Sequence, residues 1–206
     1  RYRYRPNSTG VNKMELSSKK YRVGRDALSK DEIVKVLNSC DRISDKALIQ
    51  LAISTGIRRA DIVAIKRADI DLETGNLKFV EQKKKRIWEV IIPSDACIAT
   101  LKQHINSSRN SIWLFPSPKT TGKFKNAHLH DRQAWDIFNE NLDKCKVKRR
   151  PFHALRATCV KQCLENGWSW EAISELTGDL ISTLQYHYAT PSIGEMKKLA
   201  KEKQLI

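Results

Sequence analysis

Residues 54–58 have the sequence Ser54-Thr55-Gly56-Ile57-Arg58, and they separate two apolar segments with helical periodicity. The first segment is expected to end at Gly56, because glycine commonly terminates helices. The second segment begins just after Arg58, so this arginine falls at a helix boundary where a long side chain can leave the core. Asp61 lies three positions further on and could hold the guanidinium group in an ion pair.

A second arginine lies in the stretch His153-Ala154-Leu155-Arg156, inside another predicted helix. His153 and Arg156 are three positions apart, so both are expected to project from one helix face. The planar guanidinium group binds phosphate through two hydrogen bonds and stays charged at any working pH. A neighbouring histidine can donate to a phosphate oxygen or exchange a proton with a nucleophile. Tyr186 and Tyr188 follow near the C-terminus, and a tyrosine hydroxyl can be that nucleophile if its surroundings favour ionisation.

The remaining pattern predicts a mostly helical chain with one basic hairpin. Ser29 and Glu32 have the spacing of a capping box, which places the start of ordered structure at Ser29. Two β-prone runs, 77–80 and 87–92, are joined by the basic segment 83–86, which indicates a small sheet of two or three strands. Apolar periodicity predicts the other helices at about 44–54, from 59, after 94, and at 129–144, 151–166, 169–176 and 194–203.

The composition favours an anionic partner. The chain of 206 residues has 38 Lys and Arg against 23 Asp and Glu, a net charge of +15. Such a surface attracts polyanions, and counterion release from nucleic acid is the usual source of the affinity. No apolar run approaches the ~18 residues of a membrane span, which argues against a membrane protein. The five cysteines lack zinc-ligand spacing and are odd in number, so we expect no metal site and a reducing, intracellular compartment.

Two regions are expected along the chain. Residues 1–28 carry Arg, Lys, Tyr and Ser without an apolar period, and are interpreted as a basic arm or linker from a missing N-terminal part. Residues 29–206 are expected to form one domain. Its last segment, 194–206, has apolar residues at near-helical spacing and predicts a short amphipathic tail helix.

The order of these segments resembles the tyrosine recombinase (phage integrase) family over about residues 29–206. The resemblance rests on the first-arginine box at 54–62, with Asp61 for the usual Glu, the segment leading into the hairpin at 67–72, the His-x-x-Arg box at 153–156, and the last box before the nucleophile at 176–178 with 181–183. Several specific boxes in the right order make this match far stronger than any single one.

The resemblance implies a mainly helical α+β catalytic domain with a small antiparallel sheet or hairpin. It also implies strand transfer on DNA without a metal, a cofactor or ATP. The tyrosine would attack a DNA phosphate, forming a 3′-phosphotyrosyl bond and releasing a 5′-hydroxyl. Arg58 and Arg156 would neutralise the charge on the phosphoryl oxygens. His153 would donate to an oxygen or take the tyrosine proton, and a hairpin lysine would protonate the departing 5′-oxygen.

The nucleophile is open between two tyrosines. Counting from Arg156 without gaps, the family spacing arrives at Tyr188, which we favour. Matching Ser182-Thr183 to the family's Thr-Thr points instead to Tyr186.

The hairpin lysine is open as well. Counting back from Pro93 favours Lys85, our choice, whereas counting forward from Arg58 gives Lys83. The basic side chains expected to contact DNA are Arg59, Lys83, Lys84 and Arg86.

Asp179 departs from the family pattern, which has His or occasionally Trp at this position. A carboxylate would repel phosphate unless it turns away, is protonated, or leaves the donor role to His187. Asp179 is therefore a possible catalytic residue, and it also supports the alternative of a DNA-binding relative that has lost cleavage. A basic nucleic-acid-binding module without chemistry is a third hypothesis.

The family also implies partners. Double-stranded DNA carrying a recombination site is the expected substrate, bound by a homotetramer that is a monomer or dimer when free. The tail helix at 194–206 would dock on a neighbouring protomer or pack on its own domain. We expect a viral or mobile-element integrase that works inside a host cell, in the cytoplasm or nucleoid.

Overall fold

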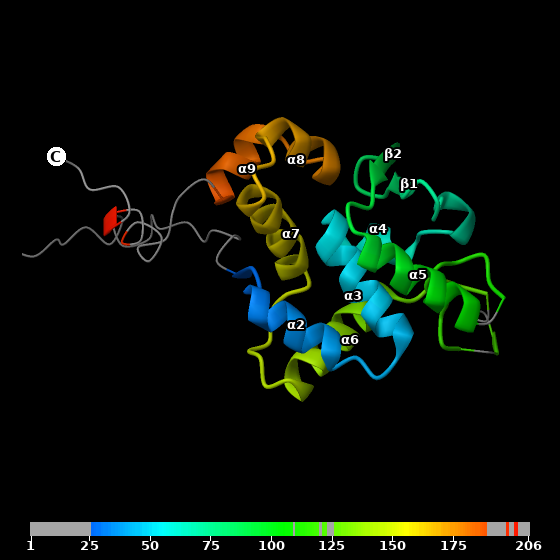
Figure 1. Cartoon of the computed structure of the whole chain (residues 1–206). Helices are drawn as coiled ribbons and strands as arrows, with labels where there is room; N and C mark the ends of the chain where they lie inside the picture. The colour runs from blue at the N-terminus through cyan, green and yellow to red at the C-terminus, as the bar shows by residue number, and fades with distance from the viewer. Residues whose placement is uncertain are drawn as a thin grey trace, which may run out of the picture.

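The computed structural model describes residues 26–108, 110–119, 121–122, 126–188, 197, 200 and 201 (Figure 1). The predicted combination of many helices with one small antiparallel sheet is confirmed. In chain order the elements are α2 Lys30–Asn38, α3 Ile43–Thr55, α4 Arg59–Val63, the 3₁₀ turn η2 Arg67–Asp69, β1 Asn76–Glu81, β2 Arg86–Ile91, α5 Asp95–Ser107, α6 Asp131–Lys144, α7 His153–Glu165, α8 Trp170–Thr177 and α9 Ile181–Tyr188. No helix among the described residues is long and apolar enough to cross a bilayer.

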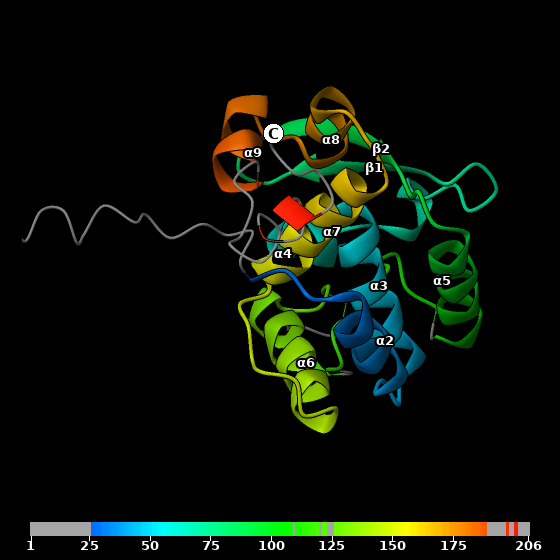
Figure 2. The ribbon, with the colours of Figure 1, turned by 60° about the vertical axis from the view of Figure 1, so that its left-hand side comes forward.

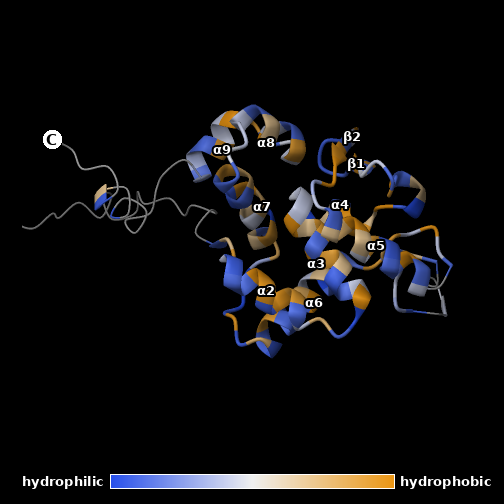
Figure 3. Cartoon of the chain, viewed as in Figure 1, coloured by the Kyte–Doolittle hydropathy of each residue, from blue (hydrophilic) through white to orange (hydrophobic). Residues whose placement is uncertain are grey.

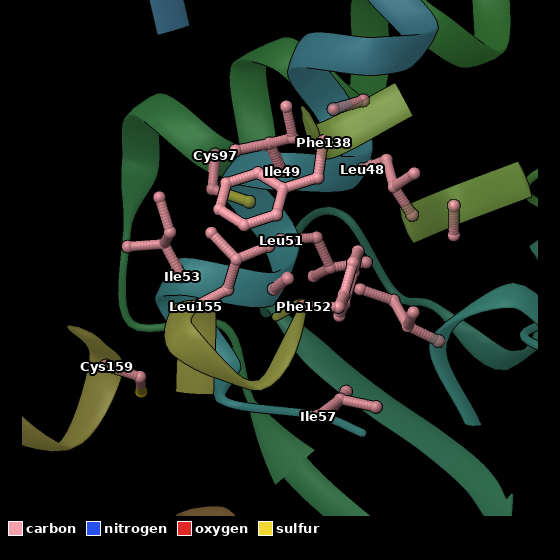
Figure 4. Packing of buried hydrophobic residues seen from close by; sticks show 14 of the residues in the cluster. Leu48, Ile49, Leu51, Ile53, Ile57, Cys97, Phe138, Phe152, Leu155 and Cys159 are labelled. Carbon is pink, nitrogen blue, oxygen red and sulfur yellow. The ribbon is translucent and has the colours of Figure 1, made fainter. Parts of the chain in front are cut away.

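Helix α3 forms the centre of the core. It contacts α2, α4, α5, α6 and α7, and most of its side chains are buried, which its apolar sequence allows on nearly every face. Figure 4 shows Leu48, Ile49 and Leu51 of α3 in one packed group with Phe138 of α6 and Leu155 of α7. Hydrophobic residues gather around this centre, and hydrophilic residues occupy the outer turns (Figure 3). Truncating one such buried aliphatic side chain to alanine typically costs ~2–5 kcal/mol.

Helix α2 begins, and helix α3 ends, where the sequence predicts. The Ser29 hydroxyl accepts a hydrogen bond from the Glu32 amide, and the Glu32 carboxylate accepts one from the Ser29 amide, so the capping box before α2 is confirmed. Gly56 follows α3 with a φ of 65°, the left-handed conformation that ends helices. This stop frees the next residues to turn away from the core.

The two strands form an antiparallel hairpin with Glu81 opposite Arg86 at its tip. Strand β1 alternates exposed and buried residues, and its buried positions are Leu77, Phe79 and Glu81. A carboxylate therefore occupies the inward face of a strand whose other inward residues are apolar. Helix α8 lies beside β2, as Figure 2 shows from a second direction.

One expectation about the C-terminal region was wrong. The sequence pattern predicts that a helix ends near Gly178 and a loop follows toward the tyrosines, with no helix before 194, but residues 181–188 form helix α9. Leu184 is fully buried and its amide donates to the Leu180 carbonyl, so tertiary packing stabilises a helix in a segment of modest helix propensity. The expected arm at 1–28 is described only from residue 26, and of the expected tail helix only Lys197, Ala200 and Lys201 are described.

Candidate active site

The two arginines singled out in the sequence lie together. Arg58 precedes α4 and is the residue at its N-terminal boundary, where an extended backbone directs the chain away from α3. Arg156 lies in the first turns of α7 and is only 3% exposed. Its guanidinium donates to the carbonyl oxygens of Gly56, at 2.6 Å, and Thr177, at 2.7 Å. These two carbonyls lie at the C-terminal ends of α3 and α8, so the ends of both helices fix the orientation of Arg156.

One carboxylate bridges the two arginines. The Nη2 atom of Arg58 donates to Oδ1 of Asp179 at 2.8 Å. The Nε and Nη2 atoms of Arg156 lie 3.0 and 2.6 Å from Oδ2 of the same residue. Asp179 follows Gly178, which ends α8 with a φ of 70°. Of the three possibilities for Asp179, the structure therefore excludes that it turns away from the arginines.

Glu81 is a second anionic partner that the sequence analysis missed. Its carboxylate accepts a hydrogen bond from Nη1 of Arg58 and another, at 2.8 Å, from Nε of Arg86. The residue is only 2% exposed. Burial acts to raise the pKa of Glu81, but the hydrogen bond from Arg86 and the charge of Arg58 outweigh it and leave the pKa below its ordinary value. The inward position of Glu81 in β1 is the sequence signal that could have identified it.

The expected ion pair between Arg58 and Asp61 is wrong. Asp61 is buried, and its carboxylate accepts a hydrogen bond of 2.8 Å from the backbone amide of Gln82. Burial raises the pKa of Asp61 above its ordinary value. Asp61 therefore anchors the hairpin tip to α4, and the guanidinium of Arg58 is held by Glu81 and Asp179 instead.

The hairpin tip brings one lysine to the cluster, and it is neither of the two favoured from the sequence. The ammonium group of Lys84 donates to the carbonyl oxygen of Gly178 at 2.9 Å and lies 3.9 Å from the Glu81 carboxylate. All three lysines of the run, Lys83, Lys84 and Lys85, are exposed. Within the described part of the chain, Lys84 is the member of this run whose ammonium contacts the site. The guanidinium of Arg86 stacks over the Trp88 ring, 4.0 Å from its centroid.

The two tyrosines of α9 lie in different surroundings. Tyr188 is half-buried and packs against the hydrophobic core. Its pKa is raised to about 12, chiefly by burial and in spite of the opposing charge of Arg156. Tyr186 is 43% exposed. Tyr188 therefore lies within the electrostatic reach of Arg156, on the side of α9 that faces the domain.

His153 begins α7 and lines a cleft of ≈ 400 Å³ together with Arg58 and Arg156. The side chain is exposed at the cleft, yet desolvation by the surrounding protein atoms, and then the charge of Arg156, lower the pKa of His153 below its ordinary value. The imidazole is therefore neutral at pH 7 and can accept a proton. Arg59, on the same cleft, forms an ion pair of 3.0 Å with Asp131. In the described parts of the chain, no cluster of three or more His, Cys, Asp or Glu side chains could hold a metal ion.

Comparisons with known proteins find similar chains of one family. The family model described as the phage integrase family matches residues 26–191. The tyrosine recombinase XerC of Roseiflexus castenholzii is 28% identical over 151 residues, which cover 71% of this chain and 48% of the relative. The tyrosine recombinase XerD of Staphylococcus saprophyticus is 26% identical over 189 residues, covering 86% and 62%. The chain thus spans about half to three fifths of these relatives.

Solved structures share the fold. The crystal structure of XerA recombinase superposes with a TM-score of 0.72 at 19% identity, covering 87% of this chain and 66% of that one. A lambda integrase dimer bound to a COC′ core site gives a TM-score of 0.61 at 16% identity, covering 81% and 61%.

Proposed function

This chain belongs to the phage integrase family, and from that premise we propose that it is the catalytic domain of a site-specific DNA recombinase. One observation carries the proposal: Arg58 and Arg156 converge on a single carboxylate, with Tyr188 close enough for the charge of Arg156 to act on it. Two guanidinium groups that share one small anion have the spacing to bind two oxygens of one phosphodiester.

In the proposed reaction, the Tyr188 oxygen attacks the scissile phosphorus and the bond from phosphorus to the 5′-oxygen breaks. The products are a 3′-phosphotyrosyl bond and a free 5′-hydroxyl. Arg58 and Arg156 stabilise the negative charge that grows on the phosphoryl oxygens, the electrostatic contribution that usually dominates such catalysis. Neutral His153 accepts the tyrosine proton. Because the phosphotyrosyl bond retains the energy of the ester, a new strand can be joined without ATP.

The departing 5′-oxygen needs a proton, and we assign its delivery to Lys84. Its ammonium group already lies against the backbone next to Asp179. Lys83 and Lys85, the residues favoured by counting along the sequence, precede and follow it in the chain, and exposure does not distinguish the three, since all are exposed. We propose that Lys83 and Lys85 contact the DNA backbone, as do Arg59 and Arg86.

Double-stranded DNA is the proposed partner. The net charge of +15 supports it, and so do relatives whose structures contain DNA, such as the lambda integrase dimer bound to its core site. A homotetramer on DNA is proposed by analogy with the lambda integrase tetramer bound to a Holliday junction. Residues 29–206 would be the catalytic domain and residues 1–28 a linker. Work inside a host cell, on viral or mobile DNA, is also part of the proposal.

A covalent-adduct assay tests the proposed activity. A duplex site is first selected from a random pool by binding to the protein, and a nick is then placed beside the scissile phosphate to trap the cleaved state. Wild-type protein should form a protein–DNA adduct that withstands denaturation. Tyr188→Phe should abolish the adduct, whereas Tyr186→Phe should keep it. If a protein with both tyrosines intact binds its site but forms no adduct, the cleavage-deficient alternative is correct.

A further inference from the structure

We propose that Asp179 is a built-in anionic ligand of the arginine pair, which the scissile phosphate must displace. The inference rests on the proposed function, because it concerns the same arginines. The inference goes beyond that function in two respects. In the free protein the arginine pair is already occupied by the Asp179 carboxylate, and substrate binding therefore exchanges one anion for another. Asp179 would thus oppose substrate binding rather than promote it.

The contacts of Asp179 are those that a phosphate would need. Its two oxygens use Nη2 of Arg58 and both Nε and Nη2 of Arg156. A phosphodiester also offers two non-bridging oxygens, and a guanidinium binds either kind of anion by the same fork of N–H donors. Two anions cannot occupy these donors together, because they would repel each other at close range. Substrate and Asp179 are therefore alternatives.

Other contacts hold Arg58 and Arg156 in place when the Asp179 carboxylate moves away. Arg156 keeps its bonds to the Gly56 and Thr177 carbonyls, and Arg58 keeps its contact with Glu81. These acceptors belong to helix ends and a buried strand position, so they do not depend on Asp179. The two guanidinium groups consequently keep their positions whether or not the Asp179 carboxylate lies between them.

Asp179 can leave by rotating its side chain. Its backbone is held, because the Ser174 hydroxyl donates to its carbonyl oxygen at 2.7 Å and its own amide lies 3.4 Å from the Thr177 hydroxyl oxygen. Its side chain remains 21% exposed, so a path to solvent exists. Helix α9, which carries Tyr188, begins two residues later. Displacement therefore needs no rearrangement of α8 and need not move the nucleophile helix.

Inorganic phosphate is a suitable probe, because it carries the anion chemistry without any DNA sequence. Calorimetric titration of the full chain should give an affinity at least ten-fold higher for Asp179→Asn than for wild type. Asn has the same shape but no charge to compete. The matched control is Glu175→Gln, which removes an exposed carboxylate from α8 and should change the affinity less than two-fold. Equal or weaker phosphate binding by a folded Asp179→Asn protein would overturn the proposal.

A second measurement uses wild-type protein and so does not depend on the variant folding. With carbon-13 in the aspartate carboxyl groups and nitrogen-15 in the arginines, phosphate should shift the signals of Asp179, Arg58 and Arg156 along one common saturation curve. Arginine shifts without any change at Asp179 would contradict the exchange. The adduct assay separates the two proposals. If the wild-type protein forms the DNA adduct but Asp179→Asn binds phosphate no more tightly, only the exchange proposal is wrong. If Asp179→Asn binds phosphate more tightly but no adduct forms, only the proposed recombinase activity is wrong.

Discussion

The Lys84 ammonium group lies 2.9 Å from the carbonyl oxygen of Gly178, and this contact ties the hairpin tip to the link between α8 and α9. The same link holds Asp179 between the two arginines. A lysine, both arginines and the start of the tyrosine helix thus meet at one short backbone segment.

Lys84→Ala should lower the rate of adduct formation by ~10²–10⁴-fold, the usual contribution of a positioned general acid. Replacing the 5′-bridging oxygen of the substrate by sulfur should restore most of the rate, because a thiolate leaves without a proton. Lys83→Ala and Lys85→Ala are the controls, and each should weaken DNA binding while leaving the rate at saturating DNA nearly unchanged. If Lys85→Ala, rather than Lys84→Ala, is rescued by sulfur, the assignment is wrong.

The cleavage rate should fall in acid because of His153. Its pKa is lowered by desolvation in the cleft and by the charge of Arg156, so the imidazole is neutral at pH 7 and becomes protonated only below its ordinary value of 6.5. The rate of adduct formation should therefore be constant between pH 7 and 8 and decline once the pH drops below that value. Tyr188, with a pKa of about 12, stays protonated throughout and adds no acid limb. His153→Gln should be slower at pH 7 but lack the decline.

Gly56→Ala should lower the free energy of unfolding by more than the cost of its positive φ alone. A φ of 65° costs an alanine ~1–2 kcal/mol, and the added Cβ would lie 3.3 Å from Thr177 Cγ2 and 3.4 Å from Cys159. Gly167→Ala is the matched control, since its φ is 78° but nothing lies within 4 Å of the added atom. Urea denaturation should show a larger loss for Gly56→Ala. Equal losses would mean that the neighbouring side chains adapt freely.

Features that depend on local chemistry were predictable from the sequence. The capping box at Ser29 and the stop at Gly56 each involve a few adjacent residues, and the structure confirms both. That Arg58 and Arg156 lie together could be predicted from the order of the motifs, because this order indicates a known family whose fold brings the two arginines to one site. Here the sequence located the site without specifying its contacts.

The missed features depend on turn geometry and on tertiary packing. Which of three adjacent lysines reaches the Gly178 carbonyl depends on backbone angles, and Lys85 has a φ of 51°, which residue counting cannot anticipate. Helix α9 lacks a strong local signal and forms around buried Leu184. Asp61 was paired with Arg58 by its helical spacing, yet the hairpin supplied Glu81 from a distant part of the chain. That pairing substituted a local contact for a tertiary one.

Glu81→Gln should cost ~2 kcal/mol of unfolding free energy at pH 7, since it removes a buried charge partner of two half-exposed arginines. The cost should depend on pH. The pKa of Glu81 in the folded protein is below its ordinary value of 4.5, because hydrogen bonding from Arg86 and the charge of Arg58 overcome the effect of burial. A depressed pKa stabilises the fold fully above the unfolded value and loses that contribution as the pH falls through the folded value.

The urea midpoints of wild type and Glu81→Gln should therefore differ most at neutral pH and converge as the pH drops below 4.5. Glu89→Gln, on the exposed face of the same hairpin, is the control and should show a small difference at every pH. A gap for Glu81→Gln that persists unchanged into acid would mean that Glu81 acts through its shape rather than its charge. Arg58 would then be held chiefly by Asp179, and Glu81→Gln should leave the phosphate affinity unaltered.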